Sequence, residues 1–160
     1  MRHFNDLFAL AAERKGGPDA LETLLPAPTP PDALARIPED RWLAQLTKCV
    51  FQAGFNWKVI EAKWDGFEAA FEGFDLGRWI LSNDDDIATL ASDARIVRNP
   101  QKIKSVPENA RFIGEVSKEH GGFGQWISEQ PASERNMLLE TMNQRGSRLG
   151  AMTGQYFLRF

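Results

Sequence analysis

The chain has 160 residues, of which 42% are hydrophobic and 26% are charged, so it is long enough to bury a core as one globular domain. No apolar run approaches the roughly 20 residues that a membrane-spanning helix needs, and the charged N-terminus is not followed by the apolar core of a signal peptide. The single cysteine, Cys49, excludes an internal disulfide. We therefore expect a cytoplasmic protein with no membrane partner.

The charge is distributed unevenly along the chain. The net charge is −3 overall, with −1 over residues 1–50, −6 over residues 51–93 and +4 over residues 94–160. An acidic protein with a basic last part can hold phosphates locally. The alternative interpretation is ordinary solvated charge, and the arithmetic alone favours it.

The N-terminal part is predicted to contain two short helices. Apolar residues from Leu7 to Ala11 indicate the first helix, which Gly16-Gly17 stops, and Pro18 begins the second. Four prolines within residues 26–31 are incompatible with a helix, so they predict an extended connector. The expected layout is one helical domain with an N-terminal helix pair (1–25), a proline-rich connector (26–37) and a body (38–160).

The first half of the body is predicted to be helical, with breaks at Gly54 and Gly66. An apolar face runs from Trp42 to Ala53, and a new helix follows Asn56. Phenylalanines at positions 67, 71 and 74 form an apolar stripe. Asp75 and Ser82 or Asn83 are the expected N-caps of the next two helices, and the acidic run 84–86 fits the positive end of the second.

The second half continues the helical pattern. Asn99-Pro100 is expected to begin a helix that Pro107 kinks and His120-Gly121-Gly122 ends. An amphipathic stretch from Glu134 to Met142 puts Met137, Leu138 and Met142 on one face, and the last helix begins near Met152. Because no alternating strand pattern appears, the sequence predicts an all-α fold of about ten short helices.

Residues 51–57, Phe-Gln-Ala-Gly-Phe-Asn-Trp, predict a corner between two helices. Gly54 permits a left-handed turn, and Asn56 can cap the next helix. Phe55 and Trp57 would then lie on the corner, where their rings can point into a cleft. The alternative is a plain corner filled by core aromatics.

A second candidate site is the loop Ser147–Gly150 between two helices. Gly150 would let a phosphate approach the backbone, and Arg145 and Arg148 would add positive charge. The alternative is an ordinary αα-hairpin, and the loop alone favours that alternative.

Several of these motifs together resemble the DNA-3-methyladenine glycosylase I family, of the helix-hairpin-helix DNA glycosylase superfamily. The resemblance covers about residues 42–160. The matching elements are Gln52-Ala53-Gly54 followed by Trp57, Ile96-Val97-Arg98-Asn99, Lys102-Ile103, Asn109-Ala110, Arg145-Gly146, Leu149-Gly150 and Thr153.

The resemblance implies a helix-hairpin-helix glycosylase-like fold and base excision from double-stranded DNA that carries alkylated purines. It implies that Trp57 stacks on an extruded base while Phe55 fills its place in the duplex. Gln52 can support this base pocket by hydrogen bonding, and the alternative is a helix-end amide that faces solvent or backbone. The DNA-binding residues it implies are Arg145, Arg148, Leu149, Gly150 and Thr153. We expect a monomer that needs no cofactor.

The sequence departs from the family pattern in four ways. The family's base-reading carboxylate aligns with Cys49, so no catalytic residue is identified, and a buried inert thiol is the expected state of Cys49. His3, Cys49 and His120 are too few for the family's two-Cys, two-His zinc site, so no metal is expected. The N-terminal aromatics are absent. Relatives continue beyond the position of Phe160, so we expect either a truncation or another source of stability for the last helix.

These departures leave two other functions open. One is a DNA-binding module that senses damaged bases without excising them. The other is a helical protein whose hairpin only packs.

Overall fold

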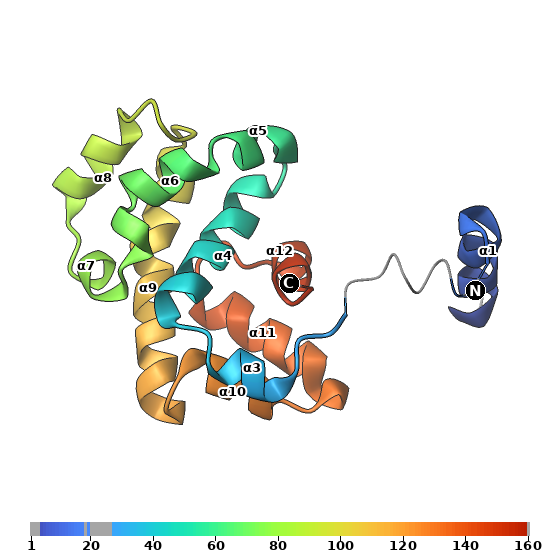
Figure 1. Ribbon diagram of the computed structural model, residues 1–160. Helices are drawn as coiled ribbons and strands as arrows, with labels where there is room; N and C mark the ends of the chain where they lie inside the picture. Colours follow the sequence, from blue (N-terminus) through green and yellow to red (C-terminus); the bar gives the residue numbers. More distant parts are fainter. Residues whose placement is uncertain (1–3, 18, 20–26, 160) are drawn as a thin grey trace.

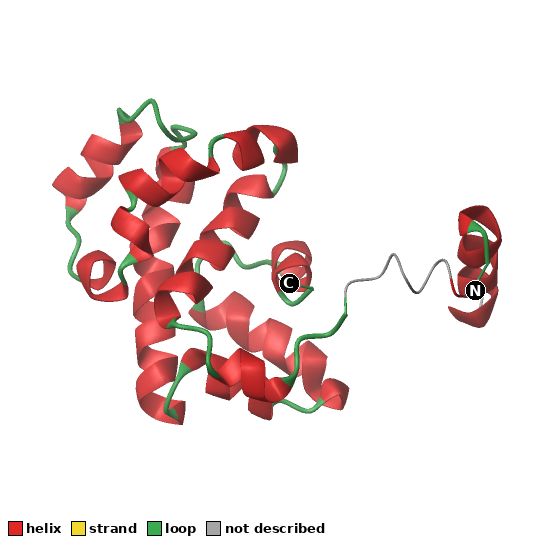
Figure 2. Ribbon diagram, viewed as in Figure 1, coloured by secondary structure: helices red, strands yellow, loops and turns green. Residues whose placement is uncertain are grey.

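The computed structural model describes residues 4–17, 19 and 27–159 of the chain. This part is helical without a strand, as Figure 2 shows, which confirms the predicted all-α class. Its elements in chain order are α1 (Phe4–Lys15), α3 (Pro31–Ala35), α4 (Glu39–Gln52), α5 (Trp57–Ala62), α6 (Trp64–Ala70), η1 (Glu72–Phe74), α7 (Leu76–Ile80), α8 (Asp84–Ala91), α9 (Pro100–His120), α10 (Phe123–Glu129), η2 (Ala132–Glu134), α11 (Arg135–Arg145) and α12 (Ala151–Phe157).

Helix α9 is the central element, and α4, α7, α8 and α10 pack against it (Figure 1). The face predicted for this helix is buried, because Ile103, Val106, Ala110 and Ile113 have no exposed surface. Pro107 does not interrupt the helix, which continues for 21 residues. Gly121 then ends it in the left-handed conformation, as expected.

The predicted helix caps are confirmed at four positions. The Asn83 side chain accepts from two backbone N–H groups, and Asp86 completes a capping box. Asn56, Asp75 and Asn99 each accept one backbone N–H bond at the start of α5, α7 and α9. The caps therefore set where the short helices around the core begin.

The apolar stripe at positions 67, 71 and 74 is buried and stacked. Phe71 lies between Phe67 and Phe74, with ring centroids 6.2 Å and 5.1 Å away. Trp64 stacks on Phe67 at 5.4 Å. This aromatic stack joins α6 and η1 to the core beside α4.

Three local predictions are wrong. Gly66 lies inside α6, and the break falls at Lys63; a Cβ on Gly66 would collide with the carbonyl oxygen of Arg95, so close packing explains this glycine. Met137 is 63% exposed, although Leu138 and Met142 are buried.

The third difference concerns the connector. Residues 27–30 form no helix and Pro30 is extended, but Pro31 is the first residue of α3 because proline suits the first helical turn. Helix α3 packs on α10, where a Cβ on Gly124 would collide with the carbonyl oxygen of Leu34. Helix α1 lies apart from the body in Figure 1, and the helix expected from Pro18 falls almost wholly outside the described residues. The division into three segments stays a prediction.

Candidate functional site

The corner between α4 and α5 has the predicted turn and helix cap. Gly54 adopts a left-handed conformation with φ of 66°, and the Asn56 Oδ1 accepts the backbone N–H of Lys58 over 3.0 Å. The side chains of Phe55 and Trp57 remain 44% and 40% exposed. Two large aromatic rings are therefore held at the surface, where a ligand can reach them, and are not sealed in the core.

Trp57 contacts the last helix of the chain. Its ring meets the ring of Tyr156, on α12, at a centroid distance of 5.2 Å and an interplanar angle of 81°. This is the edge-to-face arrangement that aromatic pairs favour. The guanidinium carbon of Arg159, which follows the end of α12, lies 5.5 Å from the centroid of Tyr156. The sequence motifs did not single out Tyr156, because its contact with Trp57 spans 99 positions of the chain.

Phe55 lies beside a buried lysine. The Lys102 Nζ is 5.9 Å from the centroid of Phe55, and it donates hydrogen bonds to the carbonyl oxygens of Phe51 (3.1 Å) and Ala53 (2.8 Å). These carbonyls belong to the C-terminal end of α4, where backbone acceptors lack helical partners. Burial, and secondarily the charge of Arg148, lowers the pKa of Lys102. Lys102 thus connects α9 to the corner.

Gln52 is buried below the corner. Its Nε2 donates to the Glu61 Oε1 over 3.3 Å, and Glu61 in turn forms an ion pair with Lys48 at 3.0 Å. This arrangement fits a supporting role across α4 and α5. It directs the Gln52 amide toward protein, away from solvent.

Cys49, which the sequence resemblance predicts to stand in place of a base-reading carboxylate, is buried at 3% exposure. Burial raises the pKa of its thiol to about 11, although the Gln45 side chain approaches the sulfur at 3.8 Å. The thiol is therefore protonated at neutral pH and carries no negative charge. Among the described residues, no group of three or more His, Cys, Asp or Glu side chains could hold a metal ion, and His3 lies outside them.

The loop between α11 and α12 is anchored from α9 by Asn109. The Asn109 Nδ2 donates to the carbonyl oxygen of Ser147 over 3.1 Å, and its Oδ1 accepts the backbone N–H of Ser147 over 2.7 Å. Leu149 is buried below the loop. Gly150 is exposed, and a Cβ placed on it would meet no atom within 4 Å. Thr153 is buried at 8% exposure.

The two arginines of the hairpin differ in their surroundings. Arg145 donates two hydrogen bonds to the carboxylate of Glu119 over 2.8 Å and 2.9 Å, so a phosphate would have to compete with that carboxylate. Arg148 is exposed and has a φ of 58°, and among the described residues its side chain donates only to the Gln101 side chain, over 3.2 Å. Arg148 is therefore the more available cation of the loop.

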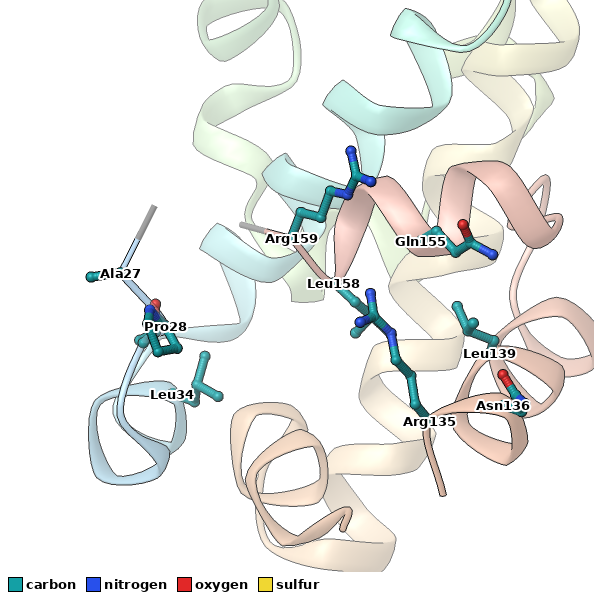
Figure 3. A pocket seen from close by; sticks show the side chains of 10 residues that line it. Ala27, Pro28, Leu34, Arg135, Asn136, Leu139, Gln155, Leu158 and Arg159 are labelled. Atoms are coloured by element: carbon teal, nitrogen blue, oxygen red, sulfur yellow. The ribbon is translucent and has the colours of Figure 1, made fainter. Parts of the chain in front are cut away.

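A cavity of about 770 Å³ lies between residues 27–29, α3, α11 and α12 (Figure 3). Arg135 and Arg159 reach it from α11 and from the end of α12, and Asn136 and Gln155 add amide groups. No local sequence pattern marks this site, because its lining comes from segments that are distant along the chain. No helix of the described ranges is both long and apolar enough to cross a membrane.

The comparisons with known proteins agree on one family. The sequence profile of the methyladenine glycosylase family matches residues 36–148. DNA-3-methyladenine glycosylase 1 of Escherichia coli (strain K12) is 33% identical over 60 residues, which are 38% of this chain and 32% of that protein. The aligned part thus spans about a third of the length of this curated relative.

Solved structures of similar fold belong to the same family. A 3-methyladenine DNA glycosylase I from Staphylococcus aureus superposes with a TM-score of 0.69 at 19% identity, over 92% of this chain and 87% of that one. A variant of 3-methyladenine DNA glycosylase I in complex with 3-methyladenine superposes with a TM-score of 0.70 at 19% identity, over 92% and 88% of the two chains. At this identity the likeness establishes the fold.

Proposed function

The chain belongs to the methyladenine glycosylase family, and from this membership we propose that it acts in base-excision repair, hydrolysing the N-glycosidic bond of alkylated purines in duplex DNA. The observation that carries the proposal is the half-exposed ring of Trp57 at the corner before α5, held edge-on by Tyr156. Duplex DNA is the proposed partner, and the proposed state is a cytoplasmic monomer.

Base flipping gives the two corner aromatics separate tasks. Extruding a base costs a few kcal/mol, and stacking on an aromatic ring returns about 1–3 kcal/mol. Trp57 offers that ring, and a purine alkylated at N3 is cationic, so a cation–π attraction adds to stacking. Phe55 would fill the vacated position in the duplex, as apolar side chains do when they enter a base step. Gln52 supports the corner from below.

The positive charge of the substrate also explains how little acid catalysis the site needs. An N3-alkylated purine leaves as a neutral base when the bond from C1′ to its nitrogen breaks, and water then adds to C1′ and gives up a proton. Because the leaving base carries the charge before bond cleavage, no strong general acid is required. The chain's task is to bind the flipped base and to exclude the intact purines.

We propose the hairpin as the sequence-independent DNA contact. Arg148 and the exposed backbone at Gly150 are the groups best suited to meet phosphates, while buried Leu149 and Thr153 hold the loop in shape. Asn109 fixes the loop from α9 through Ser147. Arg145 would contribute directly only by leaving Glu119.

One observation favours a second function. The protonated Cys49 thiol cannot supply the negative charge that a base-reading carboxylate offers to a cationic purine. The alternative is therefore a module that binds damaged DNA without excising the base. The two functions share the corner and the hairpin and differ only in bond cleavage.

Release of the free base separates these functions. Purified protein in excess is incubated with duplex DNA that carries 3-methyladenine, and free 3-methyladenine is separated by chromatography. Release by the wild type and its loss in Trp57→Ala support the glycosylase. Preferential binding of the damaged duplex without release supports the alternative. Equal affinity for damaged and intact duplex, with no release, contradicts both.

A further inference from the structure

The cavity in Figure 3 has an unusual balance of charge. Among the described residues that line it, the two charged ones are Arg135 and Arg159, and none carries a carboxylate side chain. Neither guanidinium forms an ion pair with another described residue, whereas Arg41 and Arg145 pair with Glu68 and Glu119. Both arginines are exposed at the cavity, so their charge is available to a ligand.

The remaining polar groups of the cavity suit an anion with hydrogen-bonding oxygens. Asn136 and Gln155 offer amide N–H donors, and Thr29 offers a hydroxyl. A guanidinium binds two phosphate oxygens at once through parallel N–H bonds, which makes arginine well suited to phosphate. The volume of about 770 Å³ is in the range of small-molecule sites, so it can hold more than a single ion.

The cavity and the corner are connected through α12. Arg159 lies over one side of Tyr156, with its guanidinium carbon 5.5 Å from the ring centroid, and the ring of Tyr156 meets the ring of Trp57. Gln155, the neighbour of Tyr156, faces the cavity. A ligand seated at Arg159 is therefore only one aromatic side chain away from the ring that the proposed function assigns to the extruded base.

We propose that this cavity binds the phosphate groups of a nucleotide unit, through Arg135 on α11 and Arg159 at the end of α12. The proposal rests on the proposed function for one step, because the flipped base at Trp57 would bring the phosphates of its own strand toward Arg159. The same chemistry also accepts a free nucleotide. This site lies at the ends of α11 and α12 that are remote from the loop of residues 146–150, so it is a second phosphate contact beside Arg148.

The test uses single substitutions that remove charge and keep an amide, Arg135→Gln and Arg159→Gln. Arg111→Gln is the matched control, because Arg111 is exposed on α9 and is not part of this cavity. Duplex affinity is measured from 50 to 200 mM salt, with and without an alkylated purine. One phosphate contact makes the slope of log K against log salt more negative by about one unit. Each cavity variant is therefore expected to make the slope less negative by about one unit. Arg111→Gln is expected to leave it unchanged.

A second arm detects a free ligand. Adenosine monophosphate and inorganic phosphate are titrated into the same proteins by calorimetry. A salt slope or a nucleotide affinity that depends on both arginines supports the proposal. It is overturned if Arg135→Gln and Arg159→Gln equal Arg111→Gln in both arms while their thermal unfolding matches the wild type.

Base release, measured on the same samples, separates this inference from the proposed function. If the wild type releases no base, but both cavity variants bind duplex more weakly and with a shallower salt dependence, the phosphate site is supported and the glycosylase function is not. If the wild type releases the base, but Arg135→Gln and Arg159→Gln match the Arg111→Gln control in affinity and salt slope, the glycosylase function is retained and the phosphate site is overturned.

Discussion

The Nζ of Lys102 donates a 2.8 Å hydrogen bond to the carbonyl oxygen of Ala53, the C-cap residue of α4. It also satisfies the carbonyl of Phe51 over 3.1 Å, so one buried ammonium serves two acceptors of the corner. Position 102 is 49 residues from the corner along the chain. The shape of the turn around Gly54 therefore depends on α9 as well as on its own sequence.

Replacing Lys102 with methionine should destabilise the corner. The substitution keeps the apolar stem but leaves two carbonyl groups without their donor, which costs about 1–3 kcal/mol for a buried acceptor. Urea unfolding measures the loss. Lys104→Met on the same helix is the control, because Lys104 is exposed, and it should change stability by less than about 0.5 kcal/mol. Equal stability of the two variants would show that Lys102 does not hold the corner.

Asn109 should anchor the hairpin through both of its hydrogen bonds to Ser147. Asn109→Ala removes a donor and an acceptor from a buried site, so we expect a loss of about 1–3 kcal/mol in unfolding free energy. Asn109→Asp retains the acceptor for the Ser147 N–H but loses the donor to its carbonyl. Duplex affinity should fall in both variants because the loop is less ordered. An alanine variant with wild-type stability and affinity would remove Asn109 from this role.

The two hairpin arginines should respond differently to alanine. Arg148→Ala should weaken binding about equally across DNA sequences. It should also make the slope of log K against log salt less negative by about one unit, as the loss of one phosphate contact implies. Arg145→Ala breaks an exposed ion pair with Glu119, which is worth at most about 1 kcal/mol, and should leave the slope unchanged. Affinity titrations over a salt series decide between them. The reverse pattern would mean that Arg145 leaves Glu119 to contact DNA.

The thiol of Cys49 should be inert in the folded protein. Burial raises its pKa from the ordinary value of 9.0 to about 11, so the neutral thiol is favoured by folding. The stabilising contribution is fully present below pH 9.0 and is lost as the pH rises toward about 11. Thiol labelling at pH 8 should be slow in the native protein and fast in urea, and Cys49→Ala should lack this component of the alkaline stability loss. Fast labelling of native protein would contradict the buried state.

A structural feature of this protein can be predicted from the sequence when it depends on contacts between residues that are close along the chain. Asn56, Asp75, Asn83 and Asn99 could be identified as caps because a cap bonds to a backbone N–H within three residues. Gly66 does not break a helix as its residue type suggests, because the reason for this glycine, the close approach of Arg95, is a tertiary contact.

The features of the candidate site also differ in whether a local sequence pattern predicts them. Phe55 and Trp57 could be located from a turn glycine and an asparagine cap, which are local signals. The contact of Trp57 with Tyr156 and that of Lys102 with Ala53 depend on how α12 and α9 pack, and spacing within one segment does not report them. The roles of these residues in DNA binding stay predictions.

Recognition of an alkylated purine by Trp57 can be tested by one comparison of binding affinities. The affinities of the wild type and Trp57→Ala are measured for a duplex with 3-methyladenine and for the intact duplex, with thermal unfolding recorded beside them. We predict that the variant folds, loses about 1–3 kcal/mol for the damaged duplex and loses less for the intact one, which phosphate contacts hold. A folded Trp57→Ala protein that still discriminates the damaged duplex as the wild type does would show that Trp57 does not recognise the alkylated purine.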